Sequence, residues 1–308
     1  MLSGYELTVL QMLCIYIVMA VSLQVTLGFA GQISIAAGAF AAVGAYTTAL
    51  LTTRADWPML AVLLASIVVA GASGILIGLP SLRVREDFLA IVTLGFAIIV
   101  YSLASRLPFV GGALGIPNVP LPSVGSLTLD LTTYTLFVVG VTVLVILVVI
   151  GLSRSRLGLR WRSVRDDELA ASTMGMRIGG LKLSAFAIGA ALTGLAGSLF
   201  AYSLGFVGAD SFGLDFSIMI LAMVVIGGLG SLTGAVIGAV VLALLPEMLR
   251  SLADFRLTIF GLILVVVLIA LPGGLVGSRG YGRSGLSMLK QLFIKVGGAK
   301  SERSTGSK

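Results

Sequence analysis

Long apolar runs alternate with short polar connections from the start of the chain to about position 271. A helix needs about 20 mostly apolar residues to cross the hydrocarbon core of a bilayer. The pattern therefore predicts an all-α, polytopic integral membrane protein with about nine transmembrane helices, within a range of eight to ten. The expected spans are Leu7–Leu27, Ile33–Thr53, Met59–Pro80, Phe88–Ser105, Thr132–Leu152, Ser184–Leu204, Phe216–Gly228, Leu232–Met248 and Leu257–Leu271.

The seventh and eighth expected spans, Phe216–Gly228 and Leu232–Met248, are short and rich in glycine. They are consistent with two separate crossings, or with one broken hairpin in which one arm does not cross fully. This pair is the reason for the range in the predicted number of spans.

The 20 Lys and Arg residues are distributed unevenly among the connections. Most lie in the turn 81–87, in the loop 153–183 and after Pro272. The opposite side holds only Arg54, Arg106, Arg250 and Arg256. Because cytoplasmic loops carry the excess of positive charge, the first three segments are expected in the cytoplasm. With nine spans, the N-terminus then lies outside and the C-terminus inside. Glu6 is the only early charge, so a cleaved signal peptide is not expected.

We expect one transmembrane domain over residues 1–271 and a basic cytoplasmic tail over residues 272–308. The domain includes an outward loop at 106–131 and a cytoplasmic loop at 153–183. Within the tail, a short helix on the inner leaflet and a solvated, partly ordered segment fit the sequence about equally. The apolar positions of that helix would be Leu286, Leu289, Phe293 and Val296.

The amino-acid composition limits the kinds of functional site that we expect in this chain. The chain is 58% hydrophobic and 11% charged, it has no histidine, and its single cysteine, Cys14, suits a small core side chain. No metal site, cofactor or His-based active site is expected. The net charge of +7 reflects orientation in the membrane, so no nucleic acid is expected as a partner.

The interiors of the expected spans contain no Asp, Glu, Lys or Arg. Ionisable groups inside a membrane mark proton relays and ion-coupled transport. Their absence argues against a proton-coupled carrier and against a membrane enzyme, and more weakly against a sodium-coupled carrier. Two acidic clusters lie beside arginines, at Glu86 and Asp87 and again at 166–168, and both are interpreted as forming ion pairs. The energy for transport is therefore expected to come from outside this chain.

Two clusters hold an unusual share of the 40 glycines. Gly28 and Gly31 in the first, and Gly227, Gly228 and Gly230 in the second, are read as helix breaks, which membranes tolerate where backbone is buried or lines a wet cavity. The clusters resemble each other, which would suit a duplicated half. Close helix packing explains the other glycines of the clusters. These are Gly38, Gly44, Gly234 and Gly238.

The outward loop 106–131 holds half of the prolines. A loop of this length without secondary structure is uncommon unless it is functional. A lid or a docking surface for an external delivery protein, and a rigid connector, explain it equally well. The candidate residues are Gly111, Gly112, Gly115 and Pro117.

In the loop 153–183, Glu168, Ala171 and Gly175 fall on one stripe of a helix, with Ala170 and Met174 beside it. Asp166 and Asp167 precede that helix and could cap it, and Arg165 lies just upstream. Such a helix suits docking into the groove of a soluble partner. A helix whose charges merely solvate it and fix its orientation is the alternative.

The segment Glu168–Gly175 resembles the E-x-A-A-x-x-x-G coupling loop of ABC importer permeases. The flanking sequence resembles the branched-chain amino acid permease family in particular, and the resemblance covers about Leu27 to Gly277. It rests on Leu27–Ser34, Leu82–Leu94, Gly111–Pro117, Ser155–Arg160, Lys182–Phe186, Gly194–Ala201 and Gly227–Gly234, which occur in the family's order.

This resemblance implies half of a pore. It implies a second, homologous but different permease, cytoplasmic ABC ATPase subunits and an external solute-binding protein as partners. The coupling residues would be Arg165, Asp166, Glu168, Ala170, Ala171, Met174 and Gly175. The translocation pathway would be bordered by Gly28, Gly31, Gln32, Ser34, Thr93, Gly227, Gly228, Gly230 and Ser231. The binding protein would lie near Gly111, Gly112, Gly115 and Pro117.

The leading hypothesis is a permease subunit of an ATP-driven importer in a bacterial inner membrane. Its solute would be a small polar molecule, such as a branched-chain amino acid or a related amino acid or amide. The chain has no Gly-Lys-Ser/Thr sequence, so ATP would be hydrolysed on a partner. A self-contained secondary transporter or facilitator is the first alternative, and a lipid-modifying membrane enzyme is the second.

Overall fold

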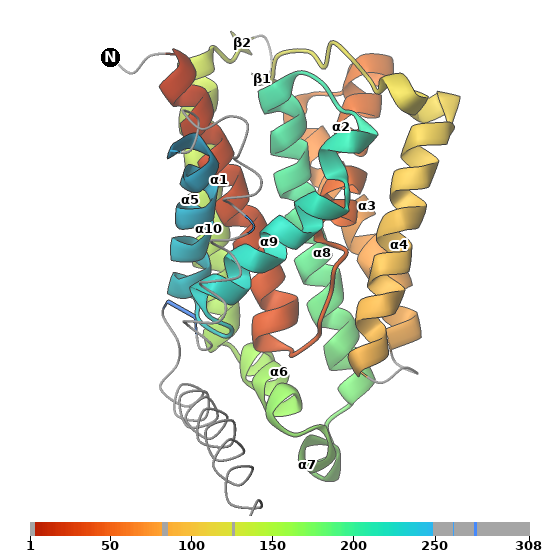
Figure 1. Ribbon diagram of the computed structural model, residues 1–308, viewed down its shortest axis with the longest axis vertical. Coiled ribbons are helices and arrows are strands. Elements are labelled where there is room, and N and C mark those ends of the chain that lie inside the picture. Colours follow the sequence, from red (N-terminus) through yellow and green to blue (C-terminus); the bar gives the residue numbers. More distant parts are fainter. Residues whose placement is uncertain (1–3, 82–85, 125–126, 249–260, 262–273, 276–308) are drawn as a thin grey trace, which may run out of the picture.

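The computed structural model describes residues 4–81, 86–124, 127–248, 261 and 274–275. Within these ranges the chain is a bundle of long helices, with two short helices beyond one of its ends (Figure 1). The helices are α1 (Gly4–Leu23), α2 (Ala37–Ala55), α3 (Met59–Ser81), α4 (Glu86–Arg106), α5 (Leu131–Arg154), α6 (Arg156–Asp166), α7 (Glu168–Thr173), α8 (Ile178–Leu204), α9 (Leu214–Gly227) and α10 (Leu232–Met248).

The loop between α4 and α5 contains the two strands of the described chain, β1 (Ser123–Val124) and β2 (Leu127–Thr128), which pair antiparallel. The predicted all-α class is confirmed, with this two-residue hairpin as a small addition. A π-helical turn, Gln24–Phe29, extends α1. Shorter 3₁₀ turns are Pro108–Val110, Gly112–Leu114 and Ala209–Phe212.

Six helical stretches of the described chain are long and apolar enough to cross a membrane. They are Gly4–Phe29, Met59–Pro80, Phe88–Arg106, Leu131–Arg154, Ile178–Leu204 and Ala209–Gly227. A polytopic membrane protein is thus confirmed, but the predicted number of spans is not. The Ala-, Gly- and Thr-rich α2 and the shorter α10 fall outside these six. Apart from Gly261 and residues 274–275, the predicted span Leu257–Leu271 and the predicted tail 272–308 lie outside the described residues.

The second span begins later than predicted, at Ala37 rather than Ile33. Side-chain hydroxyls satisfy the backbone just before it, because Ile35 N donates to Thr93 Oγ1 at 3.0 Å and Ala36 N donates to Ser34 Oγ at 3.3 Å. Gly31 turns the chain out of the preceding helix with a φ of +72°. A left-handed glycine and local hydroxyl acceptors therefore hold residues 31–36 outside the helix.

Helix α8 lies in the middle of the bundle and packs on α1, α2 and α3. Its approach to α2 is close, since a Cβ on Gly44 would meet the backbone of Gly194, and one on Gly197 would meet the backbone of Ala41. The predicted packing role of Gly44 is confirmed, and Gly38, Gly234 and Gly238 likewise lie against neighbouring atoms. Small residues in helix contacts are typical of membrane bundles.

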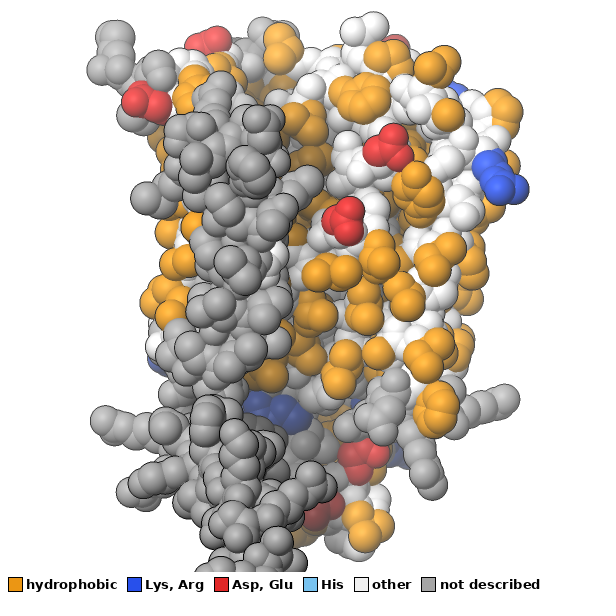
Figure 2. Space-filling view, viewed as in Figure 1, with side chains coloured by type: hydrophobic (Ala, Val, Ile, Leu, Met, Phe, Trp, Pro, Cys, Tyr) orange, Lys and Arg blue, Asp and Glu red, His pale blue; other side chains and the backbone are white. Residues whose placement is uncertain are grey.

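On the right-hand part of the bundle face shown in Figure 2, many hydrophobic side chains and few charged ones lie at the surface. Helices α4 and α5 are the least covered of the candidate spans, with 17% and 28% of their windows buried. Large side chains such as Ile99 on α4 and Leu144 on α5 are more than half exposed. These faces therefore remain available for lipid or for another membrane chain.

Candidate functional site: the α6–α7 arm and the glycine junctions

Helices α6 and α7, here called the arm, lie beyond the lower end of the bundle in Figure 1. Ser155 caps α6, because its hydroxyl oxygen accepts a hydrogen bond from Gly158 N at 3.3 Å. Trp161 is completely buried, and its Nε1 donates to Leu181 O at 3.0 Å and to Ser184 Oγ at 3.1 Å. Since Leu181 and Ser184 belong to α8, the indole attaches the arm to the central helix.

Asp167 ends α6 and caps α7, its Oδ1 accepting from Ala170 N at 2.9 Å. Of the two predicted caps, Asp167 does cap the helix, whereas Asp166 pairs with Arg165 at 3.0 Å. Glu168 forms an ion pair with Lys182 of α8, whose side chain is only 9% exposed. A buried cation of this kind needs such a partner, so this pair is a second attachment between arm and bundle.

The exposed face of α7 differs from the predicted stripe. Ala171 is buried and Glu168 turns toward Lys182. Gly175 lies after the helix with a φ of +77°, and the space around its Cα is open. The large apolar side chains that face solvent are Leu169, 76% exposed, and Met174, 81% exposed, and Met174 was among the predicted coupling residues. Sequence reasoning missed Leu169, although a large apolar residue in a charged connection was an available signal.

The first glycine junction, Gly28–Ser34, lies where the π-helical turn gives way to chain without regular secondary structure. Gln32 N donates to Thr26 O at 3.0 Å rather than to Gly28 O, which would be its acceptor in a regular α-helix. That carbonyl instead accepts from Arg165 Nη1 at 2.6 Å. An arginine of the arm therefore occupies the position that a backbone N–H would fill in a continuing helix.

The second glycine junction, Gly227–Ser231, connects α9 to α10. Gly228 and Gly230 have φ values of +117° and +82°, so the predicted helix break is present here. Ser231 Oγ accepts from Gly234 N at 3.1 Å and caps α10. Gln24 Nε2, just before the first junction, donates to Gly228 O at 3.3 Å. The two similar glycine clusters thus lie side by side, which their sequences alone did not reveal.

The other predicted pathway residues are buried in this conformation. Gln32, Ser34 and Thr93 are at most 2% exposed. The side-chain amide of Gln32 has no hydrogen-bond partner within the described part of the chain. Ser34 borders a cavity of about 10 Å³, which has room for roughly one water molecule. A role of these residues in a pathway stays a prediction.

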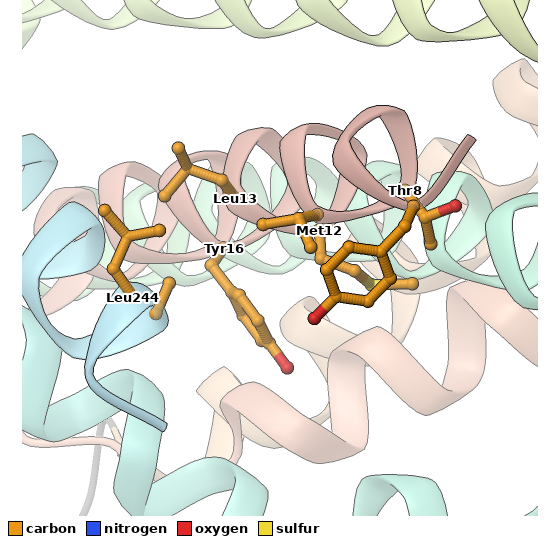
Figure 3. Close-up of a pocket in the computed structure, with 8 residues that line it drawn as sticks. Thr8, Met12, Leu13, Tyr16 and Leu244 are labelled. Carbon is orange, nitrogen blue, oxygen red and sulfur yellow. The ribbon is translucent and has the colours of Figure 1, made fainter. Parts of the chain in front are cut away.

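A larger groove of about 180 Å³ lies between α1 and α10, lined by side chains from Tyr5 to Tyr16 and by Leu244 (Figure 3). Apart from a few hydroxyl groups its lining is apolar. It lies along the N-terminal half of α1, which is the end of the bundle away from the arm (Figure 1). An apolar groove of this kind suits lipid chains better than a polar solute.

The loop 106–131 is folded rather than structureless. Ile116 and Val207 form an antiparallel bridge, and Gly111, Gly112 and Gly115 adopt positive φ values in the turns before it. Pro117 is exposed beside the bridge. The most exposed large apolar side chains of the loop are Phe109, Leu114 and Leu121, none of which was singled out in the sequence.

The candidate span Ala209–Gly227 carries two carboxylates near its first end. Asp210 and Asp215 are both exposed, and Asp210 Oδ1 accepts from Tyr101 Oη of α4 at 2.9 Å. The expected span began at Phe216 and so excluded both residues. Elsewhere in the described residues, no group of three or more His, Cys, Asp or Glu could hold a metal ion.

A family model described as "Branched-chain amino acid transport system / permease component" matches residues 6–272. The chain is 34% identical to the high-affinity branched-chain amino acid transport system permease protein LivM of Salmonella typhimurium, over 98% of this chain and 75% of the relative. It is 27% identical to LivH, the other permease protein of that description from the same organism, over 85% and 91% of the two chains. No solved structure gives a significant match.

The family match covers nearly the whole membrane region, including both glycine junctions and the arm. It confirms the resemblance that was drawn from short motifs. The chain belongs to the branched-chain amino acid transport system permease family, whose members are transport proteins rather than enzymes.

Proposed function

We propose that this chain is the permease subunit of an ABC importer and forms half of a translocation pore for branched-chain amino acids or a related amino acid or amide. ATP would be hydrolysed on a separate partner subunit. Membership of a transport permease family supports the first part. The observation that carries the second part is the pair Leu169 and Met174, exposed on an arm that is attached firmly to the bundle.

Large apolar side chains exposed on a short helix favour a protein partner. Burying them in a groove of a soluble protein contributes favourable hydrophobic free energy to binding. Leu169 and Met174 are 76% and 81% exposed and lie within or next to α7. The ATPase subunit is the proposed occupant. The charged groups of the arm, Asp166 among them, would form the polar rim of that contact.

The attachments of the arm make it suitable for transmitting force. Trp161 connects α6 to α8 through two hydrogen bonds, and the Glu168–Lys182 ion pair connects α7 to the same helix. A displacement of α7 by the ATPase would therefore move α8, on which α1, α2 and α3 pack. Alternating access would follow from movement of packed helices against each other.

The proposed pore lies on the side of α9. Carboxylates in contact with hydrocarbon are costly, so the exposed Asp210 and Asp215 favour water or a second permease next to this face. The second permease is expected to be homologous but different, which is supported by the similarity of this chain to both LivM and LivH. The buried Gln32 and Ser34 would border the pathway only after a rearrangement.

The external solute-binding protein is proposed to dock near the loop 106–131. Leu114 and Leu121 of that loop are 86% and 73% exposed, and the bridge between Ile116 and Val207 attaches the loop to the segment that precedes α9. The glycines and Pro117 of the loop would shape this surface. The arm would lie in the cytoplasm and the loop outside, as the distribution of Lys and Arg predicts, in a bacterial inner membrane.

Reconstitution tests the proposal. The full chain is purified in mild detergent with its co-purifying subunits, incorporated into liposomes, and assayed for uptake of labelled leucine with and without ATP and the binding protein. Uptake is expected only when both are present, with isoleucine and valine as competitors. Uptake at a similar rate by the purified chain alone, without ATP, would instead identify a self-contained secondary transporter.

A further inference from the structure

The side chain of Arg165 bonds the arm to the first glycine junction and lies close to the second. It lies in the last turn of α6, two residues before the cap of α7. Its Nη1 donates to Gly28 O at 2.6 Å, while Nε and Nη2 donate to Asp166 Oδ1 at 3.1 and 3.0 Å. One guanidinium thus binds a carbonyl of the bundle and a carboxylate of the arm together.

The glycines around this side chain provide the space that it needs. A Cβ on Gly31 would lie 2.6 Å from Arg165 Cγ, and a Cβ on Gly230 would lie 2.8 Å from Arg165 Nη1. Gly31 belongs to the first junction and Gly230 to the second. Both glycines therefore allow a close approach of Arg165 as well as a left-handed turn.

The acceptor of the bond lies where the backbone can rearrange. Gly28 is in the π-helical turn, and its carbonyl accepts from the arm rather than from Gln32 N. π-Helical turns occur frequently at functional sites. Beyond the turn, residues 31–36 form neither a regular helix nor a strand. Movement of Arg165 with the arm would displace the Gly28 carbonyl, to which it is bonded. The segment that follows is not held by regular α-helical hydrogen bonds.

A movement of the first glycine junction would also displace the second. Gln24 Nε2 donates to Gly228 O at 3.3 Å, and a Cβ on Gly230 would lie 3.6 Å from Gly28 O. The Arg165 guanidinium is only about one third exposed, so water competes for its bonds less than on an open surface. Charge-assisted hydrogen bonds are also stronger than neutral ones.

We propose that Arg165 is the positioning residue that transmits movement of the arm to the two glycine junctions, so that the junctions rearrange together when the ATPase partner closes. This inference rests on the proposed function. It assigns to Arg165 a contact inside the permease rather than a contact with the ATPase. Asp166 orients the guanidinium from the side facing solvent, where it is 67% exposed.

The test measures ATP hydrolysis and ATP-driven leucine uptake in the same liposomes, using the complete complex. Arg165→Met keeps the length of the side chain and removes the donors. Complex yield and ATP hydrolysis are expected to persist, while the uptake per ATP falls about tenfold or more, as for loss of a hydrogen bond to a charged group. Arg165→Lys retains one donor for Gly28 O and should recover part of the ratio. Arg160→Met, an exposed arginine of the same helix, is the matched control and should leave the ratio unchanged.

Four outcomes would overturn this role. Arg165→Met could keep the wild-type uptake per ATP, which would show that the bond transmits nothing. It could release the ATPase subunit, which would place Arg165 in docking instead. Arg165→Lys could be as defective as Arg165→Met, which would exclude hydrogen bonding to Gly28 as the basis. If the wild-type chain itself brings down no ATPase, the proposed function fails before the role of Arg165 is reached.

Discussion

Trp161 of α6 donates its indole N–H to the carbonyl oxygen of Leu181 in α8 across 3.0 Å, and the whole indole is buried. A tryptophan buried in the charged connection joins the arm to the centre of the bundle. The proposed importer mechanism depends on this attachment, because an arm that moved independently of α8 could not pass force into the membrane.

Trp161→Phe is expected to keep the packing of the arm and lose its hydrogen bonds to Leu181 O and Ser184 Oγ. The loss should lower the free energy of unfolding by about 1 kcal/mol, the usual net value of a buried hydrogen bond. Trp161→Ala should cost about 3–5 kcal/mol because it also leaves a cavity. Thermal unfolding in detergent measures both. Equal stability of the two variants would contradict the buried position of the ring.

The ion pair between Glu168 and Lys182 predicts a rescue by charge exchange. Glu168→Lys and Lys182→Glu should each weaken ATP-driven uptake, since each places two like charges together. The double exchange should restore part of it, with a coupling energy of about 1 kcal/mol in a double-mutant cycle. Lys182 has a further interaction, so complete rescue is not expected. Additive defects would show that the two side chains do not meet.

Gly44 and Gly140 form a matched pair for testing the contact between α2 and α8. A Cβ on Gly44 would meet the backbone of Gly194, whereas Gly140 on α5 has open space around it. Gly44→Ala should destabilise the bundle by about 1–3 kcal/mol through overpacking. Gly140→Ala should be neutral or slightly stabilising, because alanine favours helix. The comparison uses thermal unfolding, and similar behaviour of the two variants would contradict the close contact.

Asp215 and Leu144 distinguish the proposed pore side from the lipid side. Both are exposed in the single chain, on α9 and on α5. Asp215→Cys should react with a membrane-impermeant maleimide added outside intact cells, since the face of α9 is proposed to meet water. Leu144→Cys should not react, because lipid covers it. The native Cys14 is buried and supplies little background. Reaction at Leu144→Cys but not at Asp215→Cys would reverse the assignment of the two faces.

Much of the fold could be predicted because long apolar runs in a sequence indicate membrane helices. The bounds of α10 and the end of α8 agree with the sequence prediction. The start of α2 could not be predicted, because Thr93, far along the chain, supplies the acceptor that holds Ile35 outside the helix. Asp215 was placed outside the expected span Phe216–Gly228, whereas α9 begins at Leu214 and includes it. An exposed carboxylate can lie at the end of a helix that faces water.

The sequence predicted which segment forms the candidate site, but not which of its side chains are exposed. Helical spacing placed Glu168 and Ala171 on one stripe, which is correct, but the pairing with Lys182 that turns this stripe inward is a tertiary contact. The exposed face with Leu169 therefore had to come from the structure. Similarly, the two glycine clusters could be compared as sequences, but the guanidinium of Arg165 between them had no signature beyond its charge.

The docking of the arm on an ATPase subunit is the central claim, and affinity purification from native membranes tests it most directly. A Leu169→Glu/Met174→Glu chain is compared with wild type and with Leu121→Glu, an equally exposed leucine in the loop 106–131. The account predicts that an ATP-binding subunit co-purifies with wild type and with Leu121→Glu but is lost from the double variant, while all three chains insert at similar levels. Retention of the ATP-binding subunit by the double variant would contradict the assigned docking face, and its absence from the wild-type preparation would contradict the importer itself.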